Sequence, residues 1–280
     1  MSALSGLQIV ITRPEPAASR WARRLADEGA HPLIAPMMTL HPVDGTDGMN
    51  AIKASILEFD RYQKAIFVSQ NAVAHAFDWL DRYWPQLPMG VEYFGVGERT
   101  AQALAAQGVA VTALQSEGAM NSEALLDAPE LHQVNEQRIV IFRGVGGRGL
   151  MAETLRQRGA QVEFCELYER RLPADARDAL QAAVGKATKE PLIVALHSGE
   201  TLDNYHHTWQ QLPAHSSARQ RLAQAPLLVP GERVADQARA LGYTRLIVAV
   251  NATDSGMRAA LSQARLDPAL FQTNGIQTRD

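Results

Sequence analysis

Several features that mark particular protein classes are absent from this sequence or rare in it. The 280 residues include one cysteine, Cys165, which excludes an intramolecular disulfide and a cysteine-based zinc or iron–sulfur site. The longest apolar runs, such as Leu192–Leu196 and Leu246–Val250, are far shorter than the ~18 residues that a membrane span requires. No basic stretch followed by an apolar one opens the chain. We therefore expect a cytoplasmic protein with no membrane partner.

The chain also lacks a large excess of charge of either sign. It has 27 basic and 30 acidic residues, which gives a net charge of −3. Binding of a polyanion by bulk charge is therefore not expected, and we predict no nucleic-acid partner. Hydrophobic residues make up 46% and charged residues 20%, which is typical of a folded chain. The length suits two domains of ordinary size.

Two halves of the sequence repeat the same landmarks in the same order. Gly29 recurs as Gly159, 130 residues later, and Gly97 with its following Glu-Arg recurs 134 residues later at Gly231. Two further pairs lie between or beyond these and keep nearly the same offset: Ser69 with Ser198, and Gly108 with Gly242. Because the pairs share one order and nearly one offset, we infer an internal duplication.

Each half alternates apolar strands with amphipathic helices. Strands are expected near residues 7–12, 33–40, 65–68, 92–96 and 109–114, and again near 138–142, 162–170, 192–196, 227–229 and 246–250. Helices are expected over 16–28, 72–83 and 99–107, and over 149–157, 200–209, 233–241 and 254–265. Such alternation predicts parallel sheets covered on both faces, with ligands bound where the strands end.

The loops at those strand ends are suited to binding anions. They comprise Thr12-Arg13, Ser69-Gln70-Asn71, Gly97, Arg143-Gly144, Ser198-Gly199 and Gly231. Most of them precede a helix whose first N–H groups lack intrahelical partners and favour carboxylates or phosphates. Ordinary helix capping uses the same residue types, so the pattern leaves both interpretations open.

Other chemistries find little support in the sequence. The loop Arg143–Gly149 is rich in glycine but matches neither the dinucleotide-binding pattern nor the P-loop. Adjacent His206 and His207 point about 100° apart on a helix and have no accompanying carboxylate–histidine group, so they suit a solvated face better than a metal site. Ser198 lacks the Gly-x-Ser-x-Gly elbow of serine hydrolases. We therefore expect no metal and no cofactor.

In order, spacing and length, these landmarks resemble the uroporphyrinogen-III synthase family over about residues 5–265. The resemblance rests on Ile11-Thr12-Arg13-Pro14, Phe67–Val73, Gly95-Val96-Gly97, Arg143-Gly144, Gly159-x-x-Val162, Tyr168-x-Arg170 and His197-Ser198-Gly199. It implies an α/β fold in which two similar parallel-sheet domains of flavodoxin-like topology are joined by a two-stranded β connector.

The resemblance also implies how the chain is divided. The first domain would combine residues 1–36 with 172–266, the second would span 42–165, and the connector strands would be 33–41 and 163–171. The tail over 267–280 is expected to be disordered. The repeat alone would have suggested two consecutive domains, 1–130 and 138–265.

The reaction of the family is the closure of hydroxymethylbilane, a linear tetrapyrrole with eight carboxylates, to uroporphyrinogen III in heme biosynthesis. Water is lost and the last ring is inverted through a spirocyclic intermediate, without a metal or cofactor. The connector-strand tyrosine of the family corresponds to Tyr168, which becomes the expected general acid because a phenol is protonated at neutral pH. Two lobes on a flexible connector would close around the substrate and orient it.

Substrate binding is expected from the anion-suited loops and their basic neighbours: Arg13, Ser69, Gln70, Asn71, Gly97, Thr100, Arg143, Arg148, Ser198, Gly199 and Arg233. A monomer is expected, since no exposed heptad or long edge strand favours assembly. Two alternatives remain open. One is a two-domain module that binds an anionic small molecule without catalysis, and the other is a glycosyl or phosphoryl transferase supported only by the Gly144–Gly149 loop.

Overall fold

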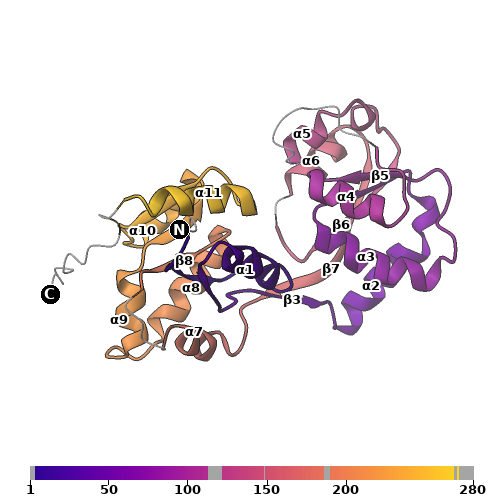
Figure 1. The fold of residues 1–280 in the computed structure, drawn as a ribbon. Coiled ribbons are helices and arrows are strands. Elements are labelled where there is room, and N and C mark those ends of the chain that lie inside the picture. The colour runs from indigo at the N-terminus through magenta and orange to yellow at the C-terminus, as the bar shows by residue number, and fades with distance from the viewer. Residues whose placement is uncertain (1–3, 113–121, 148, 186–189, 268–269, 271–280) are drawn as a thin grey trace. The chain divides into compact units, whose positions relative to one another are not determined.

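The computed structural model describes residues 4–112, 122–147, 149–185, 190–267 and 270. The chain divides into two compact units, each built around its own five-stranded sheet (Figure 1). Unit 1 combines Met1–Thr39 with Arg171–Asp280, and unit 2 is the continuous segment Leu40–Arg170. No helix in the described ranges is long and apolar enough to cross a membrane.

The sheet of unit 1 has the strand order β10-β9-β8-β1-β2, and its paired strands run parallel. The strands are β1 (Gln8–Ile11), β2 (His31–Ile34), β8 (Leu192–Ala195), β9 (Leu227–Pro230) and β10 (Leu246–Ala249). Taken in chain order, this arrangement is the 2-1-3-4-5 order of flavodoxin-like folds. The order confirms the expected α/β class and topology for this unit.

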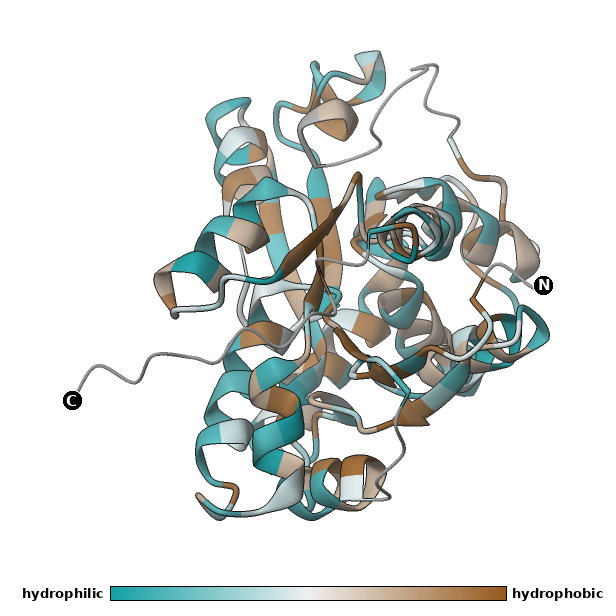
Figure 2. Cartoon of the chain, turned by 60° about the vertical axis from the view of Figure 1, so that its left-hand side comes forward, coloured by the Kyte–Doolittle hydropathy of each residue, from teal (hydrophilic) through white to brown (hydrophobic). Residues whose placement is uncertain are grey.

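Helices cover both faces of that sheet because alternate strand residues point to opposite sides. On one face, Val10 packs in a cluster with α7 (Ala176–Gly185), α8 (Gly199–Gln210), α9 (Ser217–Gln224) and α10 (Glu232–Ala240). On the other face, its neighbours Ile9 and Ile11 pack with α1 (Ala17–Asp27) and α11 (Asp254–Ala264). In Figure 2 the strands are mostly brown, whereas the helices carry both brown and teal turns, as helices with one buried side do.

The sheet of unit 2 has the order β3-β7-β6-β4-β5. The strands are β3 (Thr39–Pro42), β4 (Lys64–Phe67), β5 (Glu92–Gly95), β6 (Arg138–Gly144) and β7 (Gln161–Arg171). One face packs on α2 (Thr46–Leu57), α3 (Gln70–Tyr83) and α4 (Glu98–Ala106), and the other on α5 (Ser122–Leu126) and α6 (Leu150–Gln157). Two short 3₁₀ turns, Phe59–Arg61 and Pro129–Leu131, complete the described elements.

The sequence repeat is visible in backbone detail. Ile11 pairs with Ile34 between β1 and β2, and Ile141 pairs with Phe164 between β6 and β7, both at the offset of 130. All six repeated glycines have a positive φ between 79° and 91°: Gly29, Gly97, Gly108, Gly159, Gly231 and Gly242. Glycine adopts this conformation without the steric cost that a Cβ brings, which explains why it recurs at these turns.

The strand pairs of the two halves are nevertheless exchanged. β1 and β2, from the first half, join β8, β9 and β10 of the second, while β6 and β7 join β4 and β5 of the first. The consecutive arrangement suggested by the repeat alone is therefore wrong. Each sheet is assembled from both halves of the sequence.

The expected connector strand over residues 33–41 is wrong in one respect, because it is two strands. β2 ends at Ile34 and β3 begins at Thr39. The interruption contains Pro36, which has no N–H to donate to a strand ladder. β7 by contrast is continuous over eleven residues. The tail expected to be disordered, 267–280, lies outside the described residues except for Asp267 and Leu270.

Four helices, α2, α5, α7 and α9, have no counterpart among the expected elements. The apolar stripes of two of them are thin: α2 buries only Ile52 and Ile56, and α9 only Ala218 and Leu222. So few apolar positions give a weak helical period in the sequence.

Candidate functional site

Tyr168 is brought next to Ser69 at the end of the strands in unit 2. Tyr168 lies near the end of β7 and is 3% exposed. Its hydroxyl oxygen is 3.1 Å from Oγ of Ser69, the residue that precedes α3. Oγ of Ser69 also accepts a hydrogen bond of 3.1 Å from the N–H of Ala72, as a helix-capping serine does. One serine hydroxyl thus joins the start of α3 to the phenol.

Either hydroxyl could donate in the Tyr168–Ser69 hydrogen bond, and we assign its direction by counting partners. Among the described residues, the Tyr168 hydroxyl has Ser69 as its only hydrogen-bond partner. If Tyr168 donates to Ser69, the buried phenol proton is satisfied, whereas the opposite direction leaves that proton without an acceptor. Ser69 then accepts from both Tyr168 and Ala72, and its own proton remains available for a ligand.

Two further residues enclose the Tyr168 ring. The imidazole of His75, on α3, stacks on it with centroids 5.2 Å apart and planes inclined by 26°. Gly144, at the end of β6, has so little clearance that a Cβ there would lie 2.6 Å from Cε2 of Tyr168. The pairing of β6 with β7 shifts register between Arg143 and Gly144, which brings Gly144 opposite Tyr168. We call Ser69, His75 and Gly144 the Tyr168 socket.

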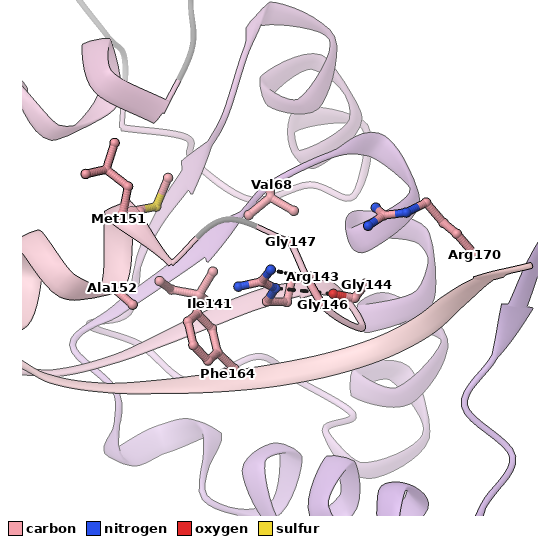
Figure 3. A pocket seen from close by; sticks show the side chains of 11 residues that line it. Val68, Ile141, Arg143, Gly144, Gly146, Gly147, Met151, Ala152, Phe164 and Arg170 are labelled. Atoms are coloured by element: carbon pink, nitrogen blue, oxygen red, sulfur yellow. Dashed lines mark hydrogen bonds between the residues drawn. The ribbon is translucent and has the colours of Figure 1, made fainter. Parts of the chain in front are cut away.

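Arg143 braces the loop that follows β6. Its side chain is 9% exposed, and its guanidinium lies over the ring of Phe164 at 4.6 Å (Figure 3). Nε donates to the carbonyl of Gly144 at 3.2 Å, and a terminal nitrogen donates to the carbonyl of Gly146. The N–H of Gly146 donates to Glu166 Oε1 at 3.0 Å, which ties the loop to β7.

A cavity of about 320 Å³ opens beside this loop. Apolar side chains from β6, α6 and β7 line it, together with Arg143, Arg170 and the backbone of Gly144, Gly146 and Gly147 (Figure 3). The guanidinium of Arg143 lies at the loop, where it already donates to loop carbonyls (Figure 3). Arg148, also expected to bind substrate, lies outside the described residues.

The other candidates of unit 2 lie at two helix starts. Gln70 and Asn71 are exposed in the first turn of α3, directly after Ser69. Gly97 precedes α4 with a φ of 87°, and the N–H of Thr100 donates to its carbonyl at 3.0 Å. Thr100 is buried, so its side chain offers a ligand little accessible surface.

In unit 1 the candidates are found on the equivalent strand and helix ends. Arg13 follows β1 and forms an ion pair of 2.7 Å with Asp254 at the start of α11. Ser198 caps α8 through a reciprocal pair of hydrogen bonds with Thr201. Gly199 is buried, and Arg233 is exposed in the first turn of α10. Arg13 is therefore already paired, whereas Arg233 is accessible to an anion.

His197, next to Ser198, is an unusual buried base in unit 1. Both ring nitrogens are buried and have no hydrogen-bond partner in the part of the chain that the structure describes. The ring meets Trp21 edge-on, with centroids 4.9 Å apart. Burial, aided by the positive charge of Arg13, lowers the pKa of His197 to about 3.

We expect His197 to make folding stability depend on pH. The unfolded chain takes up a proton at His197 near pH 6.5 and the folded chain only near pH 3. The unfolded state thus binds more protons in this window, and the free energy of unfolding falls as pH falls. From pH 7 to pH 5 this one group should remove about 2 kcal/mol. Urea unfolding of wild type and His197→Gln at both pH values checks this, and equal losses in the two proteins would contradict it.

Metal-binding groups are not apparent at either sheet edge. Within the described ranges, no three His, Cys, Asp or Glu side chains lie close enough together to hold a metal ion. The arrangement around Tyr168 instead offers a hydroxyl pair for proton transfer, and the helix starts offer N–H groups for carboxylates.

His75 was not among the sequence candidates, because nothing in its spacing from Ser69 indicates a contact with Tyr168.

The chain is similar to proteins of one family over most of its length. The family model described as "Uroporphyrinogen-III synthase HemD" matches residues 19–259. Uroporphyrinogen-III synthase of Escherichia coli (strain K12) is 35% identical over 259 residues, which cover 91% of this chain and all of that protein. The Salmonella typhimurium protein of the same name is 33% identical, with 91% of this chain and all of that protein covered.

Solved structures share the fold at low sequence identity. Uroporphyrinogen-III synthetase from Helicobacter pylori 26695 has a TM-score of 0.57 and 14% identity, with 92% of this chain and 98% of that one covered. A mutant uroporphyrinogen III synthase from the extremely thermophilic bacterium Thermus thermophilus has a TM-score of 0.53 and 15% identity, with 93% and 99% covered.

Proposed function

The chain belongs to the uroporphyrinogen-III synthase family, and we propose on that ground that it closes hydroxymethylbilane to uroporphyrinogen III. The reaction is a hydro-lyase step that releases water and inverts the last pyrrole ring through a spirocyclic intermediate. The structural observation that supports it is the Tyr168–Ser69 hydroxyl pair, held where β7 ends and α3 begins.

The first chemical task is the loss of the terminal hydroxyl. The pyrrole nitrogen of the substrate supplies electron density as the C–O bond breaks, leaving an electrophilic azafulvene. Because Tyr168 is almost fully buried, we assign contact with the leaving oxygen to Ser69, which is partly exposed. Ser69 gives its proton to the leaving oxygen and takes one from Tyr168. The carbon that closes the macrocycle later releases a proton, which restores the phenol.

The second task is orientation of a flexible polyacid. Its carboxylates are proposed to meet the helix starts at Gln70-Asn71, Gly97 and Ser198-Gly199, and the exposed Arg233. These N–H groups act locally, so a net charge of −3 is tolerable when bulk charge is screened within about 8 Å. Arg13 and Arg143 contribute by holding their loops in shape through Asp254 and the loop carbonyls.

The proposal is tested by identifying which isomer is formed from hydroxymethylbilane. Enzymatically prepared hydroxymethylbilane is incubated with the purified chain, and the type I and type III products are separated by chromatography. We expect type III to dominate with protein and type I to dominate in buffer alone. If the protein yields only type I at the buffer rate, the proposal fails and a non-catalytic binding module becomes the better account.

A further inference from the structure

His75 occupies a place in unit 2 that differs from its counterpart in unit 1. The repeat relates Ser69 to Ser198 at an offset of 129, and the same offset relates His75 to Asn204. Asn204 makes no ring contact, and its Nδ2 instead donates to the carbonyl of Met37 at 2.8 Å. The residue of unit 1 that is equivalent to Tyr168, at the offset of 130, is Met38. The imidazole and the phenol thus occur together in one unit, and both are absent at the equivalent positions of the other.

The geometry indicates that His75 restrains the ring of Tyr168. Ser69 holds the hydroxyl end of Tyr168, and the Val145 N–H donates to the Tyr168 carbonyl at 2.8 Å, which holds its backbone. Between these two anchors the ring can still rotate about its side-chain bonds unless its faces are covered. Gly144 leaves no room on one side, and the stacked imidazole of His75 covers the ring at a centroid distance of 5.2 Å.

The stack is also suited to a neutral phenol. Burial lowers the pKa of His75, an effect that the nearby carboxylate of Asp78 partly offsets, so the imidazole is neutral at neutral pH. Two neutral rings pack in an offset stack without placing a charge beside the proton donor.

We propose that His75 is a positioning residue, which holds the phenol of Tyr168 at hydrogen-bond distance from Ser69. The inference rests on the proposed function, because its effect is measured in the same reaction. An aromatic ring at position 75 is what matters, whether or not it carries nitrogen atoms.

Three variants test this inference: His75→Ala, His75→Phe and Asn204→Ala. Loss of the ring should lower kcat for type III formation about tenfold, since a small misplacement of a reacting group is costly, with KM within about twofold. Phenylalanine should restore kcat to within about threefold of wild type, because it keeps the stacked face. Asn204→Ala, a matched truncation on α8, should leave both constants unchanged.

Several kinetic results would overturn the proposed role of His75. Equal loss of kcat in His75→Ala and His75→Phe would overturn it, as would a rise in KM with kcat unchanged. In a Tyr168→Phe background His75→Ala should add no more than about twofold, since a positioning residue acts through its partner. A full additional loss there would also overturn the inference. If the wild-type chain forms no type III isomer, the proposed function itself fails, and that result is read before any variant is made.

A readout independent of activity accompanies these assays. In protein carrying ¹³C-labelled tyrosine, the ring signals of Tyr168 are assigned by their absence in Tyr168→Phe. They should shift in His75→Ala and stay in place in Asn204→Ala, because only the first variant removes a stacked ring. An unchanged Tyr168 signal in His75→Ala would contradict the stack itself.

Discussion

A Tyr168→Phe variant should form uroporphyrinogen III about 10²–10⁴ times more slowly than the wild-type chain, the usual loss when a positioned general acid is removed. The substitution deletes only the hydroxyl. The phenyl ring keeps its stack on His75 and its fit against Gly144, and Ser69 keeps its capping bond from Ala72. We therefore expect the fold to be retained, with a loss of stability of about 1 kcal/mol for one hydrogen bond.

The measurement is the initial rate of type III formation under saturating hydroxymethylbilane, corrected for the type I isomer that forms without enzyme. KM should change little, because the hydroxyl acts when the C–O bond breaks. An unchanged kcat would remove Tyr168 from the acid role. Ser216→Ala, which deletes the capping hydroxyl of α9 in unit 1, serves as the control and should retain full activity.

The proposed proton relay through Ser69 also predicts how substitutions of Ser69 and Tyr168 combine. If the proton passes from Tyr168 to Ser69 and on to the leaving oxygen, the two hydroxyls act as one unit and their losses do not add. The double variant Ser69→Ala, Tyr168→Phe should then be no slower than the slower single variant by more than about threefold. Fully multiplied losses would show that the two residues act separately.

A Gly144→Ala variant should lose most of its type III activity although it changes no polar group. The new Cβ would lie 2.6 Å from Cε2 of Tyr168 and 3.0 Å from Cζ, and His75 stacks on the same ring. The phenol must therefore move away from Ser69, and we expect kcat to fall about 10–100-fold. Crowding in a packed interior should also cost about 1–3 kcal/mol of stability.

The Gly144 prediction is checked by kcat and by urea unfolding, with Gly45→Ala as the matched control. Gly45 precedes α2 with a φ of −73°, and a Cβ there would meet nothing within 4 Å. We expect Gly45→Ala to keep full activity and to lose at most about 1 kcal/mol. Wild-type activity in Gly144→Ala would show that the Tyr168 ring moves without consequence, which would weaken the case for a fixed phenol.

Local sequence signals were sufficient for the turns and helix starts of this protein. The repeated glycines could be identified as turn residues because positive φ favours glycine, and all six adopt it. Ser69 and Ser198 could be placed before helices because a serine after an apolar strand caps the helix that follows, and both do so. These are properties of a few neighbouring residues, so the sequence carries them directly.

Local sequence signals were not sufficient for the arginines expected to bind substrate. Arginines beside anion-suited loops were expected to face the substrate, but Arg13 is paired with Asp254 and Arg143 bonds to carbonyls of its own loop. Asp254 lies 241 residues from Arg13 along the chain. A partner at that separation leaves no mark in the local pattern, although it decides whether a guanidinium is available for a ligand.

The residue pattern was enough to predict a duplicated α/β chain, and the family motifs within it pointed to Tyr168. The three-dimensional fold was needed to show which strands share a sheet, because parallel strands offer the same backbone hydrogen bonds to any neighbour and the repeat does not distinguish between partners. It also decided the surroundings of Tyr168. The register shift after Arg143 and the approach of α3 bring Gly144 and His75 to the ring, and both depend on packing between distant segments.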